Sequence, residues 1–129
     1  MSKIVDVIKN APDFICGAGV SEDEIRVAES ALNIKFSNEY KIYLKEIGLA
    51  SYDMHELTGI CKQDRLDVIK VTQNARKYFP DLADKYVVEE TSIDGIVIWQ
   101  DSSGAIYQAI PNLPIEKIAN SLADYIETY

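Results

Sequence analysis

The chain has 129 residues, the usual length of one domain, and it is acidic, with 13 basic and 21 acidic side chains and a formal net charge of −8. Its 47% hydrophobic and 26% charged residues are typical of a globular protein and exclude a disordered one. The apolar runs are too short for a transmembrane helix, and the start of the chain has no signal-peptide core. We therefore expect a single soluble domain, residues 1–129, in the cytoplasm.

The negative charge is concentrated in the second part of the chain. Residues 1–79 hold 11 basic and 12 acidic side chains, whereas residues 80–129 hold 2 basic and 9 acidic ones, which gives −7 of the total −8. Such a surface repels phosphate backbones and attracts basic molecules. We expect no direct nucleic-acid binding. A basic protein is a natural partner, although acidity can also serve solubility alone.

Helices are predicted in the first part of the chain. An amphipathic helix is expected over 3–10. Ser21-Glu22-Asp23-Glu24 has the pattern of a capping box, and the apolar periodicity that follows predicts a helix over 21–33. Ser37 can cap a third helix, which Gly48 ends. The second and third helices then form an αα-hairpin.

The middle of the chain gives weaker patterns. A glycine-rich connector is expected at 14–20, and two short strands are expected within 50–61. Residues 66–79 combine strand propensity with helical spacing, and we predict a helix there. Pro80 ends it, because proline cannot continue a helix.

Three strands of an antiparallel meander are predicted next, over 86–93, 96–100 and 105–110. Asp94-Gly95 is a strong tight-turn signal, and Asp101-Ser102-Ser103-Gly104 supplies the second turn. The middle strand is apolar without alternation, so we expect it to be central and buried.

A closing helix is predicted from Pro114 to Tyr129, because proline is favoured at the first helical position and apolar residues follow with helical spacing. The whole pattern indicates an α+β fold, in which helices flank an antiparallel β-sheet.

Catalytic chemistry has little support. His55 lies six residues before Cys61, and such a pair could act as base and nucleophile only with the right contact geometry. With Cys16, these are the only Cys and His side chains, too few for a typical zinc site. We therefore expect no catalytic residue, no metal and no cofactor, with a His55–Cys61 enzyme as the weakest alternative.

The order and spacing of several motifs resemble the SUKH superfamily. The run from Ile25 to Leu44 is similar to the family's opening helices, Gly95 to Tyr107 to its central hairpin, and Pro114 to Ile126 to its closing helix. The resemblance covers about 21–126. It implies a compact α+β domain, without cofactor or metal, that acts through protein contacts.

The resemblance also implies a function. Bacterial members of the superfamily are largely immunity proteins that bind a toxin domain, and many such toxins are basic nucleases. Other members, including a eukaryotic cell-wall regulator, work through other protein contacts. We expect an immunity protein that neutralises a cognate toxin stoichiometrically and without catalysis. The alternative is a regulatory scaffold that binds an endogenous partner.

The residues expected to bind the partner lie on the sheet side of the second part of the chain. Carboxylates can imitate a phosphate backbone in a nuclease cleft, and aromatic side chains supply anchors. Trp99 belongs to the core instead if its strand is central. The predicted contacts are Glu89, Glu90, Asp94 and Asp101 for charge, and Trp99 and Tyr107 as aromatic anchors.

Overall fold

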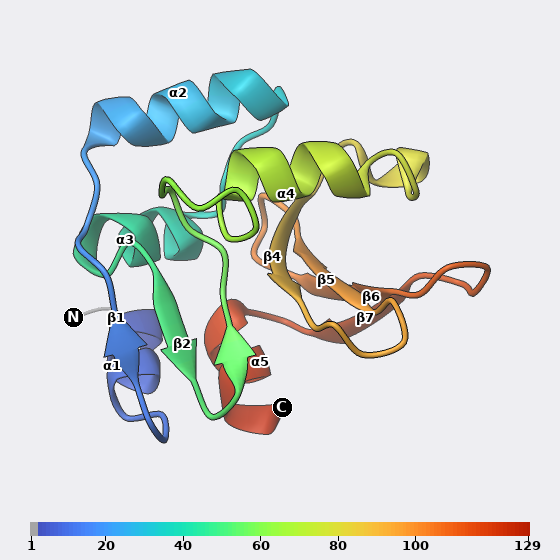
Figure 1. Cartoon of the computed structure of the whole chain (residues 1–129). Coiled ribbons are helices and arrows are strands. Elements are labelled where there is room, and N and C mark those ends of the chain that lie inside the picture. The colour runs from blue at the N-terminus through green and yellow to red at the C-terminus, as the bar shows by residue number, and fades with distance from the viewer. Residues whose placement is uncertain (1–2) are drawn as a thin grey trace.

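The computed structural model describes residues 3–129, which form an α+β fold with two antiparallel sheets (Figure 1). The predicted fold class is confirmed. The smaller sheet has the order β1-β2-β3, and the larger one has the order β4-β5-β6-β7. The strands are β1 (Ile15–Cys16), β2 (Ala50–Tyr52), β3 (His55–Glu56), β4 (Tyr86–Glu90), β5 (Val97–Gln100), β6 (Ile106–Ala109) and β7 (Glu116–Ala119).

The three predicted N-terminal helices are present as α1 (Lys3–Lys9), α2 (Glu22–Leu32) and α3 (Asn38–Glu46). The capping box at Ser21 is complete: its side chain accepts from the Glu24 N–H, and the Glu24 carboxylate accepts from the Ser21 N–H. Among residues 3–129, no helix is both long and apolar enough to cross a membrane.

Gly48 follows α3 with a φ of +79°, a conformation that other residues rarely adopt. A Cβ at this position would lie 1.9 Å from the carbonyl oxygen of Ala18. The end of α3 therefore touches the backbone of the glycine-rich connector, and only glycine fits this contact. The connector itself contains β1, a short strand that was not predicted and that pairs with β2.

The middle helix is shorter than predicted. It is α4 (Val68–Ala75), and Pro80 begins a separate 3₁₀ turn, η1 (Pro80–Leu82). Between them the chain makes turns in which the N–H groups of Tyr78 and Phe79 both donate to the carbonyl of Ala75. The predicted helix type is right, but its last turn is irregular.

The prediction of one closing helix from Pro114 is wrong. Residues 116–119 form β7, which pairs with β6 along the edge of the larger sheet, and α5 (Leu122–Thr128) starts only after Ser121. The Ser121 side chain caps α5 by accepting from the N–H of Asp124. Pairing with β7 satisfies backbone groups of β6 that would otherwise form an open sheet edge.

The larger sheet separates two clusters of buried side chains. The first cluster joins one face of the sheet to buried residues of α1, α2, α3 and α5 and to Val68 at the start of α4. The second joins the other face to Val71 and Ala75 of α4 and to Leu82 of η1. The central position of β5, with all four residues buried, confirms the sequence prediction. Figure 1 shows the terminal helices α1 and α5 next to each other, on the side of the molecule that also holds the smaller sheet.

A partly buried polar network connects α5 to α3 and the larger sheet. Glu39 of α3 accepts hydrogen bonds from the backbone N–H groups of Leu122 (2.7 Å) and Ala123 (3.0 Å) at the start of α5. The same carboxylate accepts from the Gln100 side chain of β5. An acidic side chain at a helix N-terminus also has favourable electrostatics.

Candidate functional site

Glu89 and Glu90 are neighbours in β4 but have different environments. A β-bulge lies between Val87 and Glu89, and bulges redirect the side chains that follow them. Glu89 is 3% exposed, and its carboxylate lies 2.8 Å from the His55 ring and accepts a 2.6 Å hydrogen bond from the Tyr125 hydroxyl. Glu89 is therefore not on the surface to which the sequence analysis assigned it. Glu90 is exposed.

Trp99 is also absent from the surface. It is fully buried in the cluster between the larger sheet and α4, where its ring meets Phe79 edge to face with centroids 6.1 Å apart. A side chain in this position supports the fold and does not touch a docked protein. The condition attached to Trp99 in the sequence analysis, that a central strand would bury it, is met.

Asp101 and Tyr107 form a compact unit at the turn between β5 and β6. One carboxylate oxygen of Asp101 accepts from Ser103 and from the N–H of Ala105, and the other accepts a 2.9 Å hydrogen bond from the Tyr107 hydroxyl. Burial raises the pKa of Asp101, but these hydrogen bonds outweigh it and the pKa is lowered. The ammonium group of Lys85 lies 4.7 Å from the centre of the Tyr107 ring.

Glu90 and Asp94 lie at the opposite end of the larger sheet from Asp101. Antiparallel connectivity brings the β4–β5 loop to the same end as the β6–β7 loop. A Cβ on Gly95 would be 3.3 Å from the Pro111 ring, so the two loops touch. The six predicted residues thus divide into two buried ones, a pair at one end of the sheet and a pair at the other.

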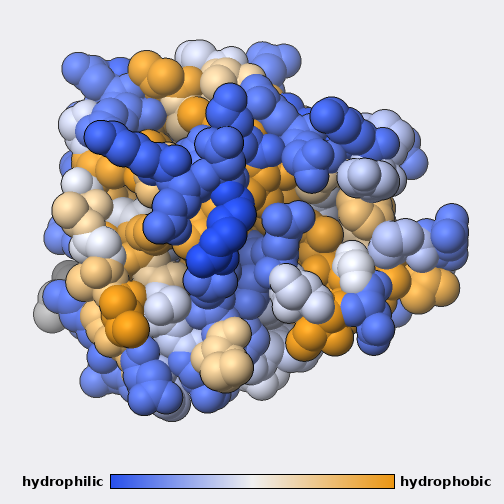
Figure 2. Space-filling model, in the orientation of Figure 1, coloured by the Kyte–Doolittle hydropathy of each residue, from blue (hydrophilic) through white to orange (hydrophobic). Residues whose placement is uncertain are grey.

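Exposed apolar side chains gather at the Glu90 end. Tyr78 (73% exposed), Ile93 (61%), Leu113 (57%) and Ile115 (40%) are four of the eight large hydrophobic residues exposed in the described chain. Figure 2 shows apolar patches among hydrophilic residues on the molecular surface. We call this region the sheet-end surface, and it consists of Tyr78, Glu90, Ile93, Asp94, Leu113 and Ile115.

A groove of about 290 Å³ runs into the sheet-end surface. Its lining comes from the end of α4 and the turns after it, from both loops and from the facing ends of β4 and β5, and it includes Tyr78, Phe79, Glu90 and Pro111. Although the Glu90 side chain is exposed, its partial desolvation at the groove raises its pKa. An aromatic wall, an apolar floor and a carboxylate form a site that can hold an apolar side chain next to a basic one.

His55 and Cys61 do not form a catalytic pair. The His55 ring bonds Glu89, and the Cys61 thiol donates instead to the carbonyl of Gln63. Burial raises the pKa of Cys61, which lowers its thiolate fraction at neutral pH. Within residues 3–129, no group of three or more His, Cys, Asp or Glu side chains is placed to hold a metal ion.

The amino-acid sequence matches a family model, described as SMI1-KNR4 cell-wall, over residues 1–129. The chain belongs to this SUKH family. The match confirms the resemblance seen in the sequence and extends it from 21–126 to the full chain. No curated protein matches this SUKH chain.

The apolar residues of the sheet-end surface in this SUKH protein were not predicted from the sequence. Ile93 precedes the Asp94-Gly95 turn, and Leu113 lies between Asn112 and a proline, so both are apolar residues in turn segments. Turn segments lie on the surface, which makes apolar side chains within them candidates for contact with a partner. This signal is present in the sequence and could have identified both residues.

Proposed function

We propose that this protein is an immunity protein, which binds a basic toxin domain in a stoichiometric complex and blocks it without catalysis. Membership of the SUKH family supports the proposal, because bacterial members are largely immunity proteins. The charge supports it too, since residues 80–129 carry a net −7 and attract a basic partner.

The sheet-end surface is the observation that carries the proposal. Protein interfaces combine a few exposed aromatic or aliphatic anchors with a polar rim. Tyr78, Ile93 and Leu113 supply the anchors, and Glu90 and Asp94 lie among them. Of the predicted contacts, we propose that Glu90 and Asp94 bind the partner at this surface. Asp101 and Tyr107 lie at the other end of the sheet, where the Asp101 carboxylate contributes to the negative potential.

A nuclease is the class of toxin that this surface fits best. A nuclease must hold phosphate groups in a basic cleft, and carboxylates on an inhibitor can occupy the same cleft. Charge then accelerates encounter while the apolar contacts slow dissociation. Association should slow by roughly tenfold when the salt concentration rises from about 0.05 to 0.5 M. An association rate that does not change with salt would contradict the idea that carboxylates imitate phosphate in the cleft, but it would be compatible with binding through the apolar residues.

A regulatory scaffold is the second candidate. The family description names the cell wall, which favours a role in regulation through an endogenous partner. The two functions differ in genomic context, because an immunity gene lies next to the gene of a toxin. A neighbouring gene for a secreted protein with a basic C-terminal domain supports immunity.

Co-expression tests the proposal. The toxin domain encoded beside this gene is expressed in a host cell with and without the protein, and growth and complex formation are measured. We expect growth to be restored and a 1:1 complex to be isolated. If the two proteins neither bind nor restore growth, the immunity function is wrong for this chain.

A further inference from the structure

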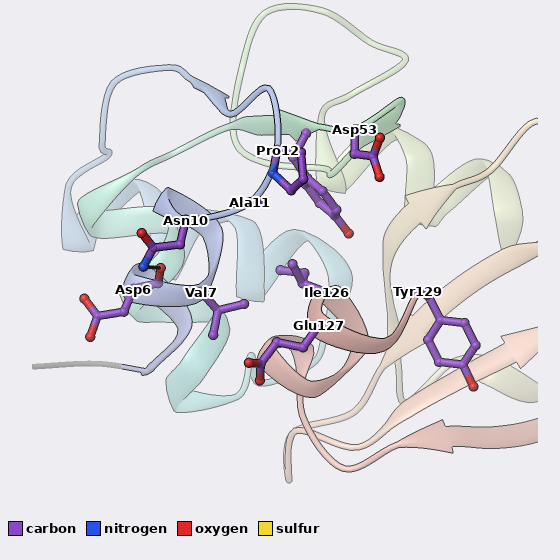
Figure 3. A pocket seen from close by; sticks show the side chains of 10 residues that line it. Asp6, Val7, Asn10, Ala11, Pro12, Asp53, Ile126, Glu127 and Tyr129 are labelled. Atoms are coloured by element: carbon purple, nitrogen blue, oxygen red, sulfur yellow. Dashed lines mark hydrogen bonds between the residues drawn. The ribbon is translucent and has the colours of Figure 1, made fainter.

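The hollows on the surface of this protein differ in charge. A pocket of about 390 Å³ lies where α1, the β2–β3 turn and α5 meet, and none of the described residues that line it is basic. Figure 3 shows its carboxylates, Asp6, Asp53 and Glu127, pointing in different directions, so they do not converge on one ligand. A groove of about 590 Å³ between α2 and α3 has the opposite charge.

The α2–α3 groove is a positively charged surface on an acidic protein. Its charged lining residues are Arg26, Lys35, Lys41 and Lys45, with Glu22 and Glu29. These four basic and two acidic side chains give a net charge of +2, whereas the other nine basic and 19 acidic residues of the chain give −10. Charge complementarity therefore favours an acidic ligand here, and only a local contact can provide it, because the rest of the molecule repels anions.

The two glutamates of the groove already have partners within the fold. The Glu29 side chain is 8% exposed, and its carboxylate accepts a 2.8 Å hydrogen bond from the Phe36 N–H. Lys41 lies 3.7 Å from the same carboxylate, and Lys45 donates to Glu22 at 3.0 Å. The Lys45–Glu22 pair is exposed, and exposed ion pairs contribute little to stability. A carboxylate from a ligand can therefore join or replace these contacts.

Lys35 provides a further cation. It is exposed in the link between α2 and α3, and within residues 3–129 it forms no ion pair. Arg26, by contrast, is paired with Asp23 on its own helix. The cations open to a ligand are thus the three lysines.

The spacing of two of these lysines fits a helix. Lys41 and Lys45 are four residues apart on α3 and both line the groove, which places them about 6 Å apart along the helix axis. Two carboxylates four residues apart on a second helix have the same spacing. Ile25 and Ile42 also line the groove and provide an apolar contact for an aliphatic side chain on that helix. An amphipathic helix laid in a groove is a common mode of peptide recognition.

A phosphate backbone fits this groove less well. It carries a charge about every 3.4 Å along each strand, so it cannot avoid the acids at the start of α2, which are Glu22, Asp23 and Glu24. A peptide helix presents carboxylates only at some positions, and these can coincide with the lysines. The mixed charge of the groove thus favours a peptide over a nucleic acid.

We propose that the α2–α3 groove binds an acidic amphipathic helix of a partner protein. Two carboxylates four residues apart on that helix bond Lys41 and Lys45, an aliphatic side chain on the same face lies against Ile42, and Lys35 attracts a further acid. The groove is a different surface from the sheet-end surface and takes a partner of opposite charge. The inference therefore goes beyond the immunity function and stands without it.

Designed peptides test the groove without any toxin. An alanine-based peptide of about 16 residues, long enough for a helix in isolation, carries a leucine and two glutamates four residues apart. It is titrated into the isotopically labelled full chain and followed by NMR, in parallel with the same peptide containing glutamines. We expect saturable shifts at the amides of Lys41, Ile42 and Lys45, with at least about tenfold weaker binding of the glutamine peptide. Equal binding of the two peptides, or shifts confined to other surfaces, overturns the proposal.

A third peptide tests the helical spacing. It has the same composition, but its glutamates are two residues apart and so lie on different faces of the helix. We expect it to bind as weakly as the glutamine peptide. Binding equal to that of the first peptide shows a general attraction of charge and overturns the helix as the ligand.

Variants locate the binding. Lys41→Gln with Lys45→Gln removes two cations from the groove, and we expect it to weaken the acidic peptide at least about tenfold. Lys62→Gln with Lys77→Gln removes the same charge from exposed positions outside the groove and should leave the affinity unchanged. Equal weakening by both pairs overturns the site.

A single variant keeps the test valid if the loss of Lys41, next to the buried Glu29, disturbs the fold. Lys35→Gln changes an exposed side chain that forms no ion pair within residues 3–129, so the fold is unaffected. We expect it to weaken the acidic peptide about threefold. An unchanged affinity in this variant contradicts the assigned role of Lys35 and overturns the proposed contact set.

Two further titrations distinguish other occupants. A short DNA duplex should give no saturable shift at Lys41 or Lys45, and binding of the duplex that is tighter than that of the acidic peptide overturns the proposal. Dilution of the protein without peptide should leave the same amides unchanged. Shifts there that follow the protein concentration show that a second copy occupies the groove, and they overturn the assignment to a partner protein.

Discussion

The Tyr125 hydroxyl donates a 2.6 Å hydrogen bond to the carboxylate of Glu89, which joins α5 to the bulged part of β4. The His55 ring, in the smaller sheet, contacts the same carboxylate at 2.8 Å. One buried acid thus connects the two sheets and the last helix. Its role is to hold the fold together, and the predicted acids that remain for a partner are Glu90, Asp94 and Asp101 at the sheet ends.

The two neighbouring glutamates give the first prediction. Replacing Glu89 with alanine leaves the Tyr125 hydroxyl buried without a partner, so we expect the free energy of unfolding to fall by about 1–3 kcal/mol. Glu90→Ala removes an exposed side chain and should change it by less than about 0.5 kcal/mol. Urea unfolding measures both. Equal effects of the two variants would show that Glu89 is not buried as described.

Two tyrosines differ in whether their hydroxyls have a partner. Tyr125→Phe loses the hydrogen bond to Glu89, and we expect it to lower the free energy of unfolding by about 1 kcal/mol or more. Tyr52→Phe removes a hydroxyl that has no hydrogen-bond partner within residues 3–129 and should be neutral or stabilising. Thermal and urea unfolding compare them. A Tyr52→Phe variant less stable than Tyr125→Phe contradicts this assignment.

Ser121→Ala tests where the last helix begins. If Ser121 caps α5, its loss costs about 1 kcal/mol of stability. In the middle of a continuous helix from Pro114, the same change would be stabilising by a few tenths of a kcal/mol, because alanine has the higher helix propensity. The sign of the change in unfolding free energy therefore decides between the two structures.

The turn acid Asp101 makes stability depend on pH. Its pKa is lower in the folded chain than in the unfolded chain, where it is about 3.9. Ionised Asp101 therefore stabilises the fold at pH values above about 3.9, and this stabilisation is lost as the pH falls through the folded pKa. We expect Asp101→Asn to reduce the unfolding free energy most at about pH 7 and progressively less below about pH 4. Urea unfolding across this range measures it, and a difference independent of pH would contradict the account.

Local sequence signals predicted the elements that depend on local interactions. The capping box at Ser21, the cap at Ser37 and the Asp94-Gly95 turn are all formed as expected, because their partners lie within a few residues. The central strand was also identified, since burial on both faces gives a continuous apolar run.

Contacts between distant residues could not be predicted in the same way. Residues 116–119 have helical apolar spacing, but the open edge of β6 makes them a strand. Glu89 looked like a surface acid because its bulge and its contacts with His55 and Tyr125 depend on tertiary packing.

The central claim is that the sheet-end surface binds the toxin, and affinity measurements on matched variants test it most directly. Tyr78→Ala with Leu113→Ala removes two anchors, and Ile15→Ala with Val27→Ala removes two equally exposed apolar residues elsewhere. Calorimetric titration with the neighbouring toxin domain should show the first pair binding at least about 30-fold more weakly, equivalent to about 2 kcal/mol, and the second pair binding as the wild type does. Unchanged affinity in the first pair, with the fold intact, would contradict the account.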